Sequence, residues 1–135
     1  MESEITIAAG DPAAATLYSH YVRRLLDRHP QWAVALRAEL ASSFTRAEME
    51  RSVAGEFADK DALHAALRIL RQRVMLRVIA RDLAGLATLD EVVSTVTALA
   101  EVAIATALSH HTGWLTRAFG DPRSPGGERQ MLIVV

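Results

Sequence analysis

The fold is most clearly predicted by residues 67–104, LRILRQRVMLRVIARDLAGLATLDEVVSTVTALAEVAI. This stretch contains the end of one long helix and the start of another. Apolar residues recur every three or four positions on both sides of Gly85, which is the spacing of an α-helix. Glycine is a typical helix terminator, and Thr88-Leu89-Asp90-Glu91 has the spacing of a capping box that opens the next helix. The short connection predicts that the two helices pack antiparallel.

The same pattern extends outward from this stretch in both directions. We predict one helix of about 25 residues from the cap at Asp59 to Gly85, and one of about 30 residues from Thr88 to Gly120. Residues 92–97 are rich in β-branched side chains, which are typical of a strand. The capping box and a continuous helical stripe favour a helix instead. That stripe consists of Val92, Val96, Leu99 and Ala103.

Three shorter helices are predicted upstream. Asp11-Pro12 begins the first, because Asp accepts hydrogen bonds from free N–H groups and Pro suits the first turn. It ends at about Arg28, before His29-Pro30. The second runs from Pro30 to about Ala41, and the third begins at the capping box that opens with Thr45 and ends at Gly55. Their apolar stripes are Leu17, Tyr21 and Leu25 in the first helix, and Trp32, Leu36 and Leu40 in the second.

The two ends of the chain differ from this helical body. Residues 1–12 are predicted to be a flexible tail, and residues 13–119 a helical domain. Residues 120–135 combine a loop rich in Gly and Pro with the apolar run MLIVV, which is typical of a buried β-strand. No other segment predicts a strand, so this one would be an orphan, and the simplest interpretation is that the chain is a fragment.

The composition agrees with an all-α bundle and excludes several kinds of protein. Half of the residues are apolar but only 5% are aromatic, which favours packed helices. A net charge of −1 argues against nucleic-acid binding. The absence of cysteine excludes disulfides and thiolate zinc sites. We see no secretory leader and no run of the ~20 apolar residues that span a bilayer, so we expect a cytoplasmic protein without a membrane segment.

Arginines on the first long helix are the candidate functional residues. Arg73, Arg77 and Arg81 form one stripe at a spacing of four, whereas Arg68 and Arg71 lie on roughly the opposite side. Apolar residues flank the stripe on both sides, so the helix should be largely enclosed, and a buried guanidinium without a partner is costly. The flanks are Leu63, Leu67, Leu70, Val74 and Val78 on one side, and Ile69, Leu76 and Leu83 on the other.

Two interpretations of the stripe stay open. The functional one is that Arg73, Arg77 and Arg81 face phosphate or contact another domain, and are exposed or weakly paired in this chain. The structural one is that they are solvated or form ion pairs with acidic residues nearby. The acids considered are Asp82, Asp90, Glu91 and Glu101.

The sequence predicts no catalytic residue and no metal site. It has no Gly-x-Ser-x-Gly motif and no Gly-rich loop that opens a helix. Asp61 and His64 share a helix face, but His110 and His111 are adjacent and point about 100° apart, so they chelate one ion poorly.

Three segments resemble the bifunctional glutamine synthetase adenylyltransferase/adenylyl-removing enzymes. The arginine-rich helix matches the pattern L-R-x-x-R-x-R-x-M-x-R-x-x-x-R-D-L and is followed by a Leu-rich turn and a long helix. Residues 17–32, LYSHYVRRLLDRHPQW, are similar to an early segment of that family. Residues 119–135, FGDPRSPGGERQMLIVV, are similar to the loop and first strand of its N-terminal nucleotidyltransferase domain. The segments occur in the family's order.

The resemblance implies a helical part of an enzyme that adds AMP from ATP to a tyrosine of glutamine synthetase and removes it by phosphorolysis. It also implies Mg²⁺ in the parent enzyme, steering by glutamine and a PII nitrogen-signalling protein, and contact with a nucleotidyltransferase domain of which residues 120–135 are the beginning. The family's Asp-x-Asp pair that holds Mg²⁺ would follow the last strand, so no metal ligand is carried over to this chain. We therefore expect the chain alone to be inactive.

Two other functions remain as alternatives. A DNA-binding or ligand-sensing helical regulator could use residues 45–73 as a helix-turn-helix with Gly55 in the turn. A helical interaction domain without a ligand is the third possibility. Salt-dependent DNA binding and binding to glutamine synthetase distinguish the three.

Overall fold

The computed structural model describes residues 13–135, which form an all-α fold. Residues 1–12, the expected tail and the Asp11-Pro12 helix start, lie outside the described residues. The helices in chain order are α1 (Ala13–Tyr18), α2 (His20–Arg28), α3 (Gln31–Glu39), α4 (Arg46–Ser52), α5 (Lys60–Leu83) and α6 (Leu89–Phe119). The all-α prediction is confirmed.

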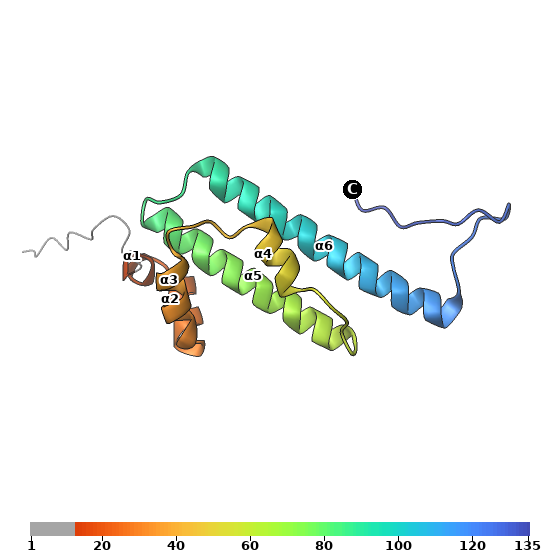
Figure 1. Cartoon of the computed structure of the whole chain (residues 1–135), viewed down its shortest axis with the longest axis horizontal. Coiled ribbons are helices and arrows are strands. Elements are labelled where there is room, and N and C mark those ends of the chain that lie inside the picture. Colours follow the sequence, from red (N-terminus) through yellow and green to blue (C-terminus); the bar gives the residue numbers. More distant parts are fainter. Residues whose placement is uncertain (1–12) are drawn as a thin grey trace, which may run out of the picture.

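The two long helices α5 and α6 lie side by side and run antiparallel, joined by the short turn that the sequence predicts (Figure 1). The turn is a Schellman motif: Leu86 N–H donates to the carbonyl of Arg81 at 2.8 Å, and Gly85 N–H to that of Asp82 at 3.0 Å. Gly85 has a φ of +68°, a conformation that glycine adopts without strain. Helix α4 packs against both long helices, whereas α1, α2 and α3 gather at one end of α5 (Figure 1).

Helix α5 is shared by two hydrophobic clusters, which explains why it is apolar on two flanks. Leu70, Val74 and Val78 pack with residues of α4, α6 and the segments beside α4. Leu76 and Ala80 pack with α1, α2 and α3. The predicted flanks are wrong at Ile69 and Leu83, which are 47% and 40% exposed, and the side chain of Leu17 lies outside the described residues. The α4–α6 cluster also contains Phe44, Met49, Val53, Leu99 and Val102.

Helix boundaries follow their capping residues. The expected single helix from Asp11 to Arg28 is interrupted at Ser19, because the Ser19 hydroxyl accepts a hydrogen bond from Val22 N–H at 3.3 Å and starts α2. His29 stacks on Trp32 where α2 passes into α3, with ring centroids 4.0 Å apart. The Thr45 capping box is complete, and its two halves join Thr45 to Glu48.

The predicted strand in residues 131–135 is not formed. These residues are exposed and belong to no regular element, and within 13–135 the one β-bridge joins Arg123 and Arg129. A strand needs a neighbouring strand to pair with, and the described residues supply none.

Helix α6 is unusually apolar for a helix with so much exposed surface. Its length and composition would allow it to cross a membrane, and only 17% of its most apolar window is buried. Polar residues interrupt this window, so the expectation of no membrane segment, which rested on unbroken apolar runs, missed it. The predicted stripe is also shifted: Val96 is 39% exposed, and Thr95 and Val102 are buried beside Leu99. Since α6 packs along α4 and α5, its length and apolarity are weak reasons to expect a membrane.

Candidate functional site

The arginine stripe on α5 does not form the open surface that the sequence suggested. The Arg77 and Arg81 side chains are only 4% and 8% exposed, and both are paired with acids. The expectation that the stripe is exposed or weakly paired is therefore wrong for these two residues. The reason is that α3, α4 and Phe44 between them fold over Arg77, whereas Leu40, the α5–α6 turn and the start of α6 surround Arg81.

Arg77 joins α5 to the end of α3 and the start of α4, which lie 38 and 29 positions away in sequence. Its Nη1 donates to Oε1 of Glu48 in α4 at 3.1 Å, and its Nη2 donates to Oε2 of Glu39 at the end of α3. The guanidinium carbon lies 4.3 Å from the centroid of the Phe44 ring, a cation–π contact. Arg77 thus ties α3, α4 and the junction between them to α5.

Arg81 is more completely satisfied. Its Nε and Nη2 donate to Oε1 and Oε2 of Glu91 at 2.7 and 3.0 Å, a bidentate pair. Nη1 also donates to the carbonyl of Leu40 at 2.6 Å, and Nη2 to that of Leu86 at 3.0 Å. The guanidinium therefore connects the end of α3 with both sides of the α5–α6 turn.

The pKa shifts follow these contacts. The hydrogen bond with Glu91 raises the pKa of Arg81, and the same bond lowers the pKa of Glu91. Burial raises the pKa of Glu48, but hydrogen bonds from Thr45 and Arg77 outweigh it, so the pKa of Glu48 is lowered. Each carboxylate is thereby held in its charged form, as an ion pair requires.

Arg73 is the member of the stripe that keeps its guanidinium available. It is half-buried and makes no ion pair or hydrogen bond with another residue in the described part of the chain. It lines a cavity of about 230 Å³ together with Arg51, Ser52 and Arg77, and with the acids Glu39 and Glu48. Contact of Arg73, Arg77 and Arg81 with phosphate or another domain therefore stays a prediction, and Arg73 is the one of the three without an ion pair in the described part of the chain.

The acid partners were predicted only in part. Glu91 was among the four acids considered, but Glu101 pairs with Arg46 of α4 instead. Glu39 and Glu48 were missed, because their approach to Arg77 depends on how α3 and α4 fold over α5. One signal was present: Glu48 already had a role in the predicted capping box, which fixes its carboxylate near the start of α4.

Titratable side chains also lie close together at the end of α5 and α6 that is opposite the α5–α6 turn. His64 of α5 faces His111 of α6, with ring centroids 5.8 Å apart, and His111 contacts the edge of Trp114. Within residues 13–135, no group of three or more His, Asp or Glu residues is placed to hold a metal ion. Asp59-Lys60-Asp61 also has Asp-x-Asp spacing, a pair that the sequence-based expectations did not include. It opens a helix, and Asp59 caps α5 by accepting from Ala62 N–H at 2.8 Å.

Comparison with known proteins identifies relatives along most of the chain. The family model for glutamate-ammonia ligase adenylyltransferase matches residues 13–135. The bifunctional glutamine synthetase adenylyltransferase/adenylyl-removing enzymes of Nitrosomonas eutropha and Nitrosomonas europaea are each 42% identical, over 124 and 134 residues that cover 87% and 94% of this chain. The Bordetella pertussis enzyme is 38% identical over 131 residues, 90% of the chain. The chain spans 13–14% of the length of these curated relatives. No solved structure matches it.

Proposed function

Because the chain belongs to the glutamate-ammonia ligase adenylyltransferase family, we propose that it is part of an enzyme that attaches AMP to glutamine synthetase and removes it. In this proposal the chain is a helical part of that enzyme without catalytic residues. The relatives carry both activities in their names, which supports this assignment. The observation that carries the proposal is the family match over residues 13–135, which includes the arginine-rich helix α5 and all of α6.

The arrangement of charges supports a structural role for most of this chain. Arg77 and Arg81 direct their donors inward to carboxylates and carbonyls, so they hold α3, α4 and α6 on α5. Asp59, the first residue of the Asp-x-Asp spacing at the start of α5, caps that helix. We propose that the catalytic carboxylates and the Mg²⁺ and ATP sites of the enzyme lie outside residues 13–135, and that this chain alone is inactive.

The remaining expectations from the family resemblance are part of the same proposal. The enzyme would act in the cytoplasm, respond to a PII nitrogen-signalling protein, and place a nucleotidyltransferase domain next to residues 120–135. Met131–Val135 would then gain the strand neighbours that they lack among the described residues. Arg73 would face that domain or the phosphate that it handles, because its guanidinium is not used by the helices around it.

A chimera tests the proposal. In the Nitrosomonas europaea enzyme, the segment that matches this chain over 134 residues is replaced by this chain. We expect the chimera to adenylylate glutamine synthetase and to release ADP from the adenylylated form with phosphate and Mg²⁺. A folded chimera without either activity contradicts the proposal. The isolated chain, in the same assay, should release no ADP above background and should show no salt-dependent DNA binding.

A further inference from the structure

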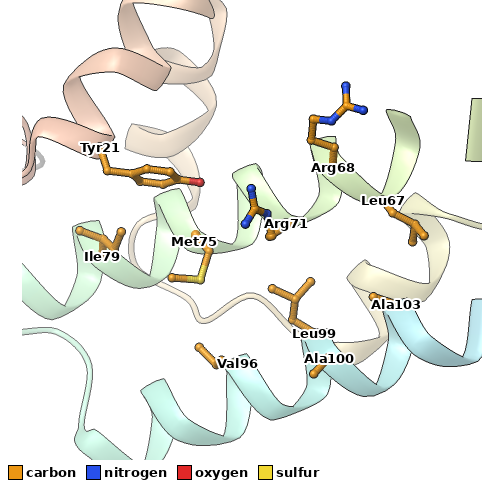
Figure 2. A pocket seen from close by; sticks show the side chains of 10 residues that line it. All are labelled: Tyr21, Leu67, Arg68, Arg71, Met75, Ile79, Val96, Leu99, Ala100 and Ala103. Atoms are coloured by element: carbon orange, nitrogen blue, oxygen red, sulfur yellow. The ribbon is translucent and has the colours of Figure 1, made fainter. Parts of the chain in front are cut away.

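An apolar groove runs between α5 and α6 beside Tyr21 of α2, and none of the described helices covers it. Its volume is about 660 Å³. Figure 2 shows Met75 reaching from α5 toward α6 and Leu99 reaching from α6 toward α5, with the guanidinium groups of Arg68 and Arg71 along the α5 edge. The rest of the lining is Leu67, Ile79, Val96, Ala100 and Ala103.

The exposed surface of α6 continues this groove along the helix. Leu89, Val93, Val96, Ala100 and Ile104 recur at spacings of three and four, so they form one face, which we call the α6 stripe. Leu89, Val93 and Ile104 are 77%, 56% and 46% exposed. Groove and stripe together are elongated and parallel to the helices, which suits a helix better than a compact small molecule.

The charges at the edge of the groove indicate which kind of helix would bind there. Arg68 and Arg71 are exposed, and neither pairs with an acid anywhere in the described part of the chain. No acidic residue lines the groove. An apolar floor with two unpaired guanidinium groups on one edge is complementary to a helix with one apolar face and carboxylates beside it.

We propose that this groove is a docking site for an amphipathic α-helix that carries acidic side chains on the edge facing Arg68 and Arg71. The docked helix covers the α5–α6 seam where no residue of α4 lines it, and gives the exposed α6 stripe a packing partner. This inference is independent of the AMP chemistry, since it depends only on the shape, apolarity and charge of the surface.

The test uses two designed helical peptides of about 20 residues with identical apolar faces. One carries Glu along the flanks and the other carries Lys at the same positions. Fluorescence anisotropy with the whole chain should show that the Glu peptide binds about tenfold more tightly than the Lys peptide. The preference should shrink as NaCl rises from about 50 mM to about 500 mM, because salt screens exposed charges.

Variants of the chain locate the binding site. The double variant Arg68→Glu/Arg71→Glu should reverse the preference, so that the Lys peptide binds more tightly. The matched double variant Arg37→Glu/Arg117→Glu, with two exposed arginines outside the groove, should keep the original preference. Ala100→Trp fills the groove from an exposed position and should weaken both peptides, and circular dichroism checks that each variant is folded.

Several outcomes overturn the proposal. Equal binding of the two peptides would contradict the proposal, because the proposal depends on charge complementarity. An unchanged preference in Arg68→Glu/Arg71→Glu would contradict it for the same reason. Sedimentation of the chain with vesicles of anionic phospholipid, without charge-selective peptide binding, assigns the surface to a membrane. If the chain dimerises and Ala100→Trp abolishes the dimer, the groove instead binds a second copy of the chain.

Discussion

Arg81 and Glu91 form a bidentate ion pair across the α5–α6 turn, with Nε–Oε1 and Nη2–Oε2 distances of 2.7 and 3.0 Å. The two residues are ten positions apart, and the pair closes the turn that sets α5 and α6 antiparallel. The same guanidinium reaches the carbonyls of Leu40 and Leu86, so it also joins α3 to this corner. Arg81 is therefore a structural centre of the fold.

Replacing Arg81 should destabilise the chain more than replacing any exposed arginine. Arg81→Ala leaves Glu91 and two carbonyls without their donor, and we expect it to lower the free energy of unfolding by about 3 kcal/mol. Arg81→Lys should recover only part of this loss, because an ammonium group cannot form the two parallel bonds. Urea denaturation followed by circular dichroism measures both, with the exposed Arg117→Ala as control. Losses equal to that of the control would contradict the assignment.

Acid should weaken the same pair. The folded-state pKa of Glu91 lies below its ordinary value of 4.5 because it accepts hydrogen bonds from Arg81. The unfolded chain therefore binds more protons just below pH 4.5, so stability rises with pH in that range. The stability that the Arg81–Glu91 pair contributes is fully present above about pH 4.5 and is lost as the pH falls through the folded-state pKa of Glu91.

The variant Glu91→Gln makes this dependence measurable. The difference in unfolding free energy between the original chain and Glu91→Gln should be largest near neutral pH and should close as the pH falls below about 4.5. Glu128→Gln, at an exposed residue without an ion pair in the described part of the chain, should show a difference near zero throughout. A Glu91→Gln difference that stays constant with pH would mean that the pair contributes no pH-dependent stability.

The sequence predicted the elements well where local signals act alone. Gly85 ends one long helix and the Thr88 hydroxyl opens the other by accepting from Glu91 N–H at 3.2 Å. The second half of that capping box fails in the structure, since the Glu91 carboxylate binds Arg81 instead. Local spacing could not predict this competition, because it depends on two helices meeting.

The same limit explains the arginine stripe and the last residues. Burial of Arg77 depends on α3 and α4, which bring Glu39 and Glu48 to it across 38 and 29 positions. The apolar run at 131–135 has strand composition, but a strand also needs a partner, which composition cannot report. Helical periodicity correctly separated α5 and α6 from strands because each repeats its pattern over many turns.

Two glycines offer a matched comparison of backbone effects. Gly85 has a φ of +68°, whereas Gly113 lies within α6, and an added Cβ would meet no atom within 4 Å at either position. Gly85→Ala should therefore destabilise the chain by about 1 kcal/mol through backbone strain. Gly113→Ala should stabilise it by roughly 0.5–1 kcal/mol, because Ala favours a helix interior. Thermal unfolding measures both, and a destabilised Gly113→Ala would indicate a crowded neighbourhood that the structure does not show.

Substitutions of Arg73 and Arg77 should have different effects, although the two residues are one helical turn apart. Arg77→Ala should lower stability, whereas Arg73→Ala should leave stability almost unchanged. Arg77→Ala removes the partner of Glu39 and Glu48 and the contact with Phe44. Because the two carboxylates are 40% and 33% exposed, we expect a loss of about 2–3 kcal/mol, less than for a fully buried pair. Arg73→Ala breaks no ion pair within the described residues and should change stability by less than about 0.5 kcal/mol.

The functional half of this comparison uses the chimera with the Nitrosomonas europaea enzyme. If Arg73 faces the catalytic domain or its phosphate, Arg73→Ala should lower the rate of AMP removal about tenfold or more while the melting temperature of the chain stays unchanged. Arg73→Lys should restore most of the rate if charge alone is needed, and little of it if the planar guanidinium is needed. Full activity in Arg73→Ala would show that Arg73 makes no functional contact with the catalytic domain or its phosphate. A fall in melting temperature equal to that of Arg77→Ala would instead show that Arg73 also stabilises the fold.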